Sequence, residues 1–89
     1  DLHPEIVLAL LIVERVFYNL GQEFLITSVL DGKHMRGSLH YVGAAVDIRL
    51  PASELDDIID ELHSGLGSNY DVVPESDHIH IEFQPKIGA

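Results

Sequence analysis

Cysteine is absent from this chain of 89 residues, and basic residues are scarce. Five Lys and Arg stand against 15 Asp and Glu, which gives a formal net charge of −10. The lack of cysteine excludes a disulfide framework and a thiolate metal site. The lack of basic residues argues against nucleic acid and anionic membranes as partners, because both are negatively charged. The chain does have six histidines, so a metal site built from histidine and carboxylate ligands is possible.

A long hydrophobic run is missing as well. The longest run, Ile6 to Val13, ends at Glu14 and is far shorter than the roughly 18 residues of a membrane-spanning helix. Asp1 and Glu5 precede it where a signal peptide would carry positive charge, so no signal peptide is predicted. The length predicts a single domain over residues 1–89, which we expect to be a monomer.

Hydrophobic periodicity predicts two helices and four strands. The helices are expected over residues 4–20, with Gly21 as the C-terminal cap, and from an N-cap at Ser53 to a stop at Gly65 or Gly67. The strands are expected over residues 24–29, 44–50, 70–73 and 78–83, with a glycine-bearing loop over 31–43. This order predicts an α+β fold, with a small, mostly antiparallel sheet and both helices packed on it.

The second helix explains much of the negative charge. Its apolar residues form one stripe, which is expected to be buried, whereas its acidic residues lie on the opposite side of the helix. The apolar stripe is Leu55, Ile58, Ile59, Leu62 and Leu66, and the acids are Glu54, Asp56, Asp57, Asp60 and Glu61. We interpret the acids as a solvated face, which needs no functional explanation.

Two of the predicted strands carry metal-ligand side chains opposite their apolar side. Asp47 alternates with apolar neighbours on one strand, and His78 and His80 do so on the other. If these strands pair, His40, Asp47 and His80 could bind one cation. Two imidazoles and a carboxylate suit Zn²⁺ and leave a fourth position for water, whose pKa the metal lowers toward about 7. The alternative is that the histidines belong to an ordinary exposed sheet face.

A hydrolytic site also needs a group that accepts a proton from that water. Asp77 lies three residues before His80, and Glu75 lies five before it. Either carboxylate could take the proton and pass it to a leaving amine. His78 could bind a developing oxyanion or orient the base.

Two short motifs strengthen the metal interpretation. Residues 38–47, SLHYVGAAVD, resemble the S-x-H-x-x-G-x-A-x-D motif of the M15 class of zinc D-Ala-D-Ala and L-Ala-D-Glu peptidases. Residues 77–80, DHIH, are similar to the second motif of that family, D-H-x-H. The Hedgehog signalling domain shares this fold and zinc site, so the motif does not guarantee catalysis.

The resemblance implies a Hedgehog/DD-peptidase-like fold and assigns roles to residues. The zinc ligands would be His40, Asp47 and His80. Asp77 would be the catalytic acid and base, with Glu75 as the second choice, and His78 would be a second histidine near the metal.

Members of the family commonly also use a basic residue near the zinc to hold the substrate carboxylate or to polarise the scissile carbonyl. Lys33 and Arg36 in the glycine-bearing loop are our candidates, and Arg49 is the third. Ser38 would hydrogen-bond within the loop or orient its neighbours. Gly43 would allow the chain to reverse tightly between the ligand histidine and the ligand-bearing strand.

The expected function is zinc-dependent hydrolysis of peptide bonds in bacterial cell-wall stem peptides, as a carboxypeptidase or an endopeptidase. The expected source is a bacterium or a phage, and the expected substrate is peptidoglycan. A non-catalytic, zinc-stabilised binding domain of the same fold is the alternative, since metals often stabilise small domains. The chain could also be one domain of a longer lysin.

Overall fold

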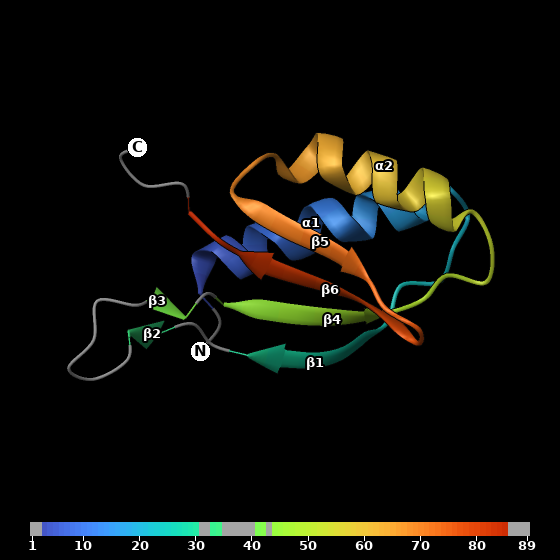
Figure 1. The fold of residues 1–89 in the computed structure, drawn as a ribbon. Coiled ribbons are helices and arrows are strands. Elements are labelled where there is room, and N and C mark those ends of the chain that lie inside the picture. Colours follow the sequence, from blue (N-terminus) through green and yellow to red (C-terminus); the bar gives the residue numbers. More distant parts are fainter. Residues whose placement is uncertain (1–2, 31–32, 35–40, 43, 86–89) are drawn as a thin grey trace.

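In the part of the chain that the structure describes, the fold contains two helices and a four-stranded sheet, with a separate pair of short strands (Figure 1). We describe it from a computed structural model that covers residues 3–30, 33–34, 41–42 and 44–85. The elements are α1 (Pro4–Asn19), β1 (Ile26–Leu30), β2 (Lys33–His34), β3 (Tyr41–Val42), β4 (Ala45–Arg49), α2 (Leu55–Leu66), β5 (Tyr70–Pro74) and β6 (His78–Phe83). The prediction of an α+β fold with two helices on an antiparallel sheet is confirmed.

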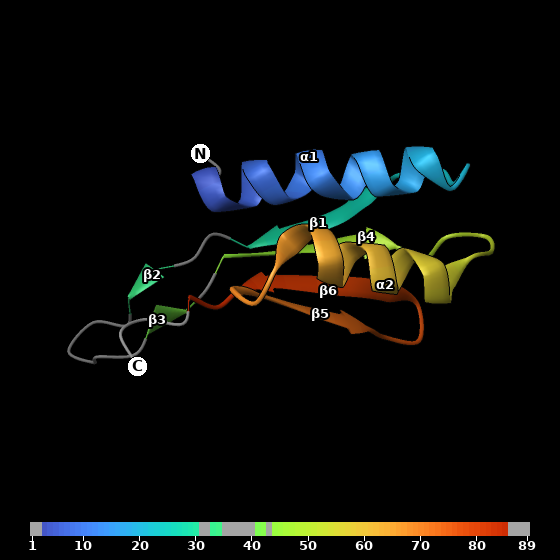
Figure 2. The ribbon, with the colours of Figure 1, turned by 90° about the horizontal axis from the view of Figure 1, so that it is seen from above.

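Every strand pair of the larger sheet is antiparallel, and the spatial order is β1-β4-β6-β5. Both helices lie against the same face of this sheet, as the two views in Figures 1 and 2 show together. The other face is covered by neither helix, and we call it the open face. Strand alternation places these residues on it: Ser28, Leu30, Ala45, Asp47, Arg49, Asp71, Val73, His78, His80 and Glu82.

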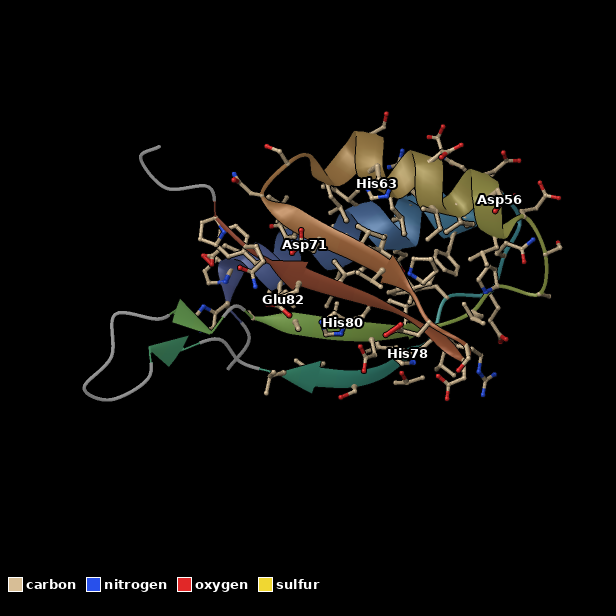
Figure 3. All side chains as sticks on the ribbon, viewed as in Figure 1. Asp56, His63, Asp71, His78, His80 and Glu82 are labelled. Carbon is tan, nitrogen blue, oxygen red and sulfur yellow. The ribbon has the colours of Figure 1, made fainter. Side chains whose placement is uncertain are left out.

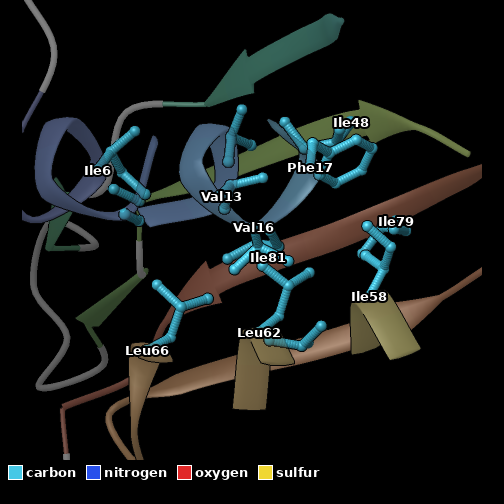
Figure 4. Close-up of a cluster of buried hydrophobic side chains, with 14 residues drawn as sticks. Ile6, Val13, Val16, Phe17, Ile48, Ile58, Leu62, Leu66, Ile79 and Ile81 are labelled. Atoms are coloured by element: carbon cyan, nitrogen blue, oxygen red, sulfur yellow. The ribbon is translucent and has the colours of Figure 1, made fainter. Parts of the chain in front are cut away.

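The core lies between the helices and the sheet (Figure 4). Its largest fully buried side chains come from both layers: Ile6, Val13 and Phe17 of α1, Ile58 and Leu62 of α2, Val46 and Ile48 of β4, and Ile79 and Ile81 of β6. Burial of each such side chain contributes about 1.5–3 kcal/mol to folding. The core therefore fixes which faces of β4 and β6 point inward and which polar residues remain on the open face.

The start of α2 differs from the prediction. The predicted N-cap, Ser53, does not cap the helix; Glu54 occupies that position in a left-handed conformation with φ of 66°, without a side-chain cap hydrogen bond. Ser53 instead contacts Gln22, whose amide nitrogen donates to the Ser53 hydroxyl and whose amide oxygen accepts from the Ser53 backbone N–H, both at 3.2 Å. The polar groups of Ser53 are thus used by a residue far away in the sequence.

The two predicted stop glycines of α2 have different roles. Gly67 ends the helix with φ of 80°, a value that favours glycine. Gly65 lies inside the last turn, where a Cβ would come within 2.9 Å of the Ile12 side chain. Gly65 therefore permits the close approach of α1 and α2 and does not end the helix.

Residues 31–43, expected to be a loop, contain the short strands β2 and β3. Lys33 pairs with Val42, and His34 pairs with Tyr41. The remaining residues of this segment, and with them Gly43, lie outside the described part of the chain. Among the residues that the structure describes, no helix is long and apolar enough to cross a membrane.

Candidate metal centre

The site is built where β4 and β6 run side by side. Their antiparallel register places Asp47 directly opposite His80, and Arg49 opposite His78. Because Val46, Ile48, Ile79 and Ile81 are buried in the core, the alternating residues must project from the open face. His80 Nδ1 lies 2.8 Å from Asp47 Oδ1, although the two residues are 33 positions apart in the sequence.

Carboxylates and imidazoles alternate in a row along this face. Asp77 Oδ1 lies 2.6 Å from His78 Nδ1, and His78 Nε2 lies 3.8 Å from Asp47 Oδ1. The row continues from Asp47 to His80, whose Nε2 lies 3.0 Å from Glu82 Oε1. Figure 3 shows His78, His80 and Glu82 along β6, whereas His63 projects from α2. The 3.8 Å separation is too long for a hydrogen bond but allows charge attraction.

The neighbouring acids favour the charged form of both histidines. The hydrogen bond to Asp77 raises the pKa of His78 above its ordinary value; partial burial opposes this, and the charges of Asp47 and Glu75 add to it. Burial lowers the pKa of His80, but the hydrogen bonds to Glu82 and Asp47 outweigh it, so this pKa is raised as well. A cation placed here would be attracted by the same carboxylates.

The chemistry of these donors fits zinc. The Asp47 carboxylate and the His80 imidazole are both ligand types that Zn²⁺ binds in proteins, and they already lie in contact. Among the described residues, no group of three His, Asp or Glu side chains is arranged to hold a metal. The third predicted ligand, His40, lies outside the described residues. Whether the three bind one ion therefore stays a prediction.

The open face is hollowed beside these two residues. A shallow pocket of about 230 Å³ lies between β1 and β4, and its lining includes Ser28, Leu30 and Ala45 together with Asp47 and His80. The pocket brings solvent-accessible space against the two proposed ligands. A larger groove between α1 and α2 is lined by Leu11 and neighbouring helix residues and contains no histidine.

Of the other predicted site residues, Asp77 and Glu75 belong to the described part of the chain, whereas Ser38 and Arg36 do not. Asp77 is highly exposed, with 83% of its side chain accessible. It does not contact the Asp47–His80 pair directly; His78 lies between them and is close to both Asp77 and Asp47. Glu75 lies in the turn between β5 and β6, where its backbone N–H donates to the His78 carbonyl. Ser38 and Arg36 lie outside the described residues.

Among the basic candidates, Arg49, the third choice, is the one whose side chain the structure describes. Arg49 projects from the open face and is the register partner of His78. Lys33 is described only as backbone in β2, so its side chain gives no test of the first choice. Arg49 is therefore the basic residue that the described structure brings nearest to the site.

Glu82 is the site residue that the sequence motifs missed. It hydrogen-bonds His80, and its second oxygen accepts from the Gln84 side chain. The alternation of the strand could have indicated Glu82, because it places Glu82 on the same side of β6 as His78 and His80. Neither motif includes Glu82. Comparison with known proteins adds no assignment: no family model, no curated protein and no solved structure matches the chain.

Proposed function

We propose that this protein is a zinc peptidase that hydrolyses peptide bonds in the stem peptides of bacterial cell walls. The observation that carries the proposal is the contact between Asp47 and His80, which come from two separate motifs and meet at 2.8 Å. The ligands would be His40, Asp47 and His80. The resemblance to the M15 motifs supports the choice of peptide bonds as substrate.

Asp77 and His78 can perform the proton transfers that hydrolysis needs. Zinc, when bound, supplies Lewis acidity, which polarises a carbonyl and lowers the pKa of water. Asp77 accepts a proton and returns it to the leaving amine, and its exposure lets it exchange protons with solvent. His78 donates a hydrogen bond to Asp77 and thereby orients that carboxylate.

Substrate binding would use a positive charge near the row. Arg49 lies across from His78 on the open face, where its guanidinium can pair with a substrate carboxylate. Lys33 and Arg36 remain candidates from the sequence. The acidic row itself would repel an anionic peptide, so a basic residue is required to offset it.

A non-catalytic zinc-binding domain is the second candidate. The exposure of Asp77 favours it, because catalytic acids and bases characteristically lie in clefts, whereas the Asp77 side chain is 83% exposed. Zinc would then stabilise the small core and bind a partner without hydrolysis.

The decisive experiment is mass spectrometry of defined muropeptides after incubation with zinc-loaded protein. We expect new termini at one peptide bond, with loss of activity in His80→Gln and in Asp77→Asn, where Asp77→Asn retains bound zinc. His63→Gln is the matched control, since His63 is exposed on α2, and it should keep full activity. Intact muropeptides in the presence of stoichiometric zinc would refute the peptidase and favour the binding domain.

A further inference from the structure

Glu82 lies two residues after His80 on β6 and therefore on the same face of the sheet. Its Oε1 lies 3.0 Å from His80 Nε2, and its Oε2 accepts a hydrogen bond from the Gln84 side chain. The Glu82 side chain is 27% exposed. Both of its oxygens thus have partners, which restricts the orientation of the carboxylate.

The two ring nitrogens of His80 face different carboxylates. Nε2 contacts Glu82 and Nδ1 contacts Asp47. A neutral imidazole carries a proton on one nitrogen only. When Nε2–H donates to Glu82, the lone pair of Nδ1 is directed at Asp47. Histidines that bind metals almost always donate their other ring N–H to a carboxylate, a carbonyl or water, and this fixes the tautomer.

We infer that Glu82 is a positioning residue for the metal site. It holds His80 in the tautomer protonated on Nε2, so that Nδ1 is the nitrogen offered to a cation shared with Asp47. Gln84 in turn orients Glu82. The inference rests on the proposed function for the presence of a cation, and it assigns the ligand atom that the motifs leave open.

Glu82 acts through His80 and is not itself a ligand of the same ion. Its oxygen contacts the ring nitrogen that faces away from Asp47. A cation held by Asp47 and by Nδ1 would therefore leave the Glu82 hydrogen bond intact. A direct ligand role would require that bond to break and the ring to turn.

The test combines zinc affinity with the protonation state of the ring. Zinc affinity is measured by competition with a chromophoric chelator, and long-range ¹H–¹⁵N NMR of the zinc-loaded protein identifies which nitrogen of His80 carries the proton. We expect the proton on Nε2 and the metal on Nδ1. Glu82→Ala should weaken zinc binding by about 10–100-fold. Glu82→Gln should weaken it less, because the amide oxygen can still accept from Nε2–H.

Asp71→Asn is the matched control. Asp71 is the register partner of Glu82 on the same face, so its substitution removes a nearby charge without touching the His80 hydrogen bond. Its zinc affinity should stay within about twofold of the wild type. Circular dichroism of each variant without zinc checks the fold, and Glu82→Gln carries the test if Glu82→Ala does not fold.

The outcomes separate this inference from the proposed function. Unchanged zinc affinity in the Glu82 variants, or zinc on Nε2, overturns the positioning role. Failure of the wild type to bind zinc overturns both ideas. Zinc bound through Nδ1, with weaker binding in the Glu82 variants but no muropeptide cleavage, supports the positioning role and refutes only the peptidase.

Discussion

The contact between Asp47 and His80 can be measured without any metal, by a double-mutant cycle of Asp47→Asn and His80→Gln in the presence of a chelator. A hydrogen bond to a charged group contributes about 1.5–3 kcal/mol, whereas exposed ion pairs contribute about 0.2–1 kcal/mol. The two side chains are 28% and 34% exposed, so solvent screens them in part. We therefore expect a coupling of about 1 kcal/mol in the free energy of unfolding at about pH 5.5.

This coupling should depend on pH in one direction. The pKa of His80 is raised in the folded protein. Its charged-state contribution is therefore complete below the unfolded value of about 6.5 and is lost as the pH rises through the higher folded value. At about pH 9 only a hydrogen bond from neutral His80 can remain, so the coupling should fall below about 0.5 kcal/mol.

Urea unfolding followed by circular dichroism measures these free energies for the wild type, both single variants and the double variant. A cycle of Asp71→Asn with His80→Gln is the control, because Asp71 lies opposite Glu82 in the strand register and not opposite His80. The coupling energy of this control cycle should be near zero. A coupling of Asp47 with His80 that is absent at the lower pH, or that grows as the pH rises, would refute the geometry on which the metal site rests.

Three further predictions concern the same framework. A zinc concentration of about 100 times Kd should stabilise the wild type by about 2.7 kcal/mol and raise Tm by about 10–20 °C, and Asp47→Asn should abolish the shift; an equal shift in the variant would contradict the ligand assignment. Ile81→Ala, at a fully buried position, should cost about 2–5 kcal/mol in urea unfolding, whereas Val73→Ala on the open face should cost less than about 1 kcal/mol. Tyr70→Phe removes the 2.7 Å hydrogen bond to the Glu5 carbonyl and should lower the free energy of unfolding by about 1 kcal/mol. A variant as stable as the wild type would show that this hydrogen bond between β5 and α1 does not stabilise the fold.

Local sequence patterns predicted both helices and the four strands of the larger sheet, whereas the short strands β2 and β3 lie in a segment expected to be a loop. Apolar residues at helical spacing, such as Ile6, Val13 and Phe17, select the buried side of α1. Alternation in β6 buries Ile79 and Ile81 and leaves His78 and His80 on the other side. These choices depend only on neighbours within a few residues and on the removal of apolar surface from water, so they can be read without the fold.

Side-chain contacts that depend on tertiary packing or on rotamers were harder to predict from the sequence. Serine is a residue type that often caps helices, but Ser53 hydrogen-bonds the Gln22 side chain instead. No residue near Ser53 in the sequence indicates this contact. Glu82 could be assigned to the correct side of its strand, yet its contact with His80 depends on side-chain rotamers, which alternation does not specify.

The sequence by itself determined which residue types face away from the core, and the two motifs indicated that His40, Asp47 and His80 act together. Only the tertiary structure decided that β4 and β6 are neighbours and that Asp47 stands opposite His80, with His78 and Glu82 two residues away along β6 on either side. A shift of two residues would keep every apolar side chain in the core and yet place a different partner opposite Asp47. Side-chain packing in the core and the connections between the strands, which no local pattern encodes, select one of these registers and so define the site.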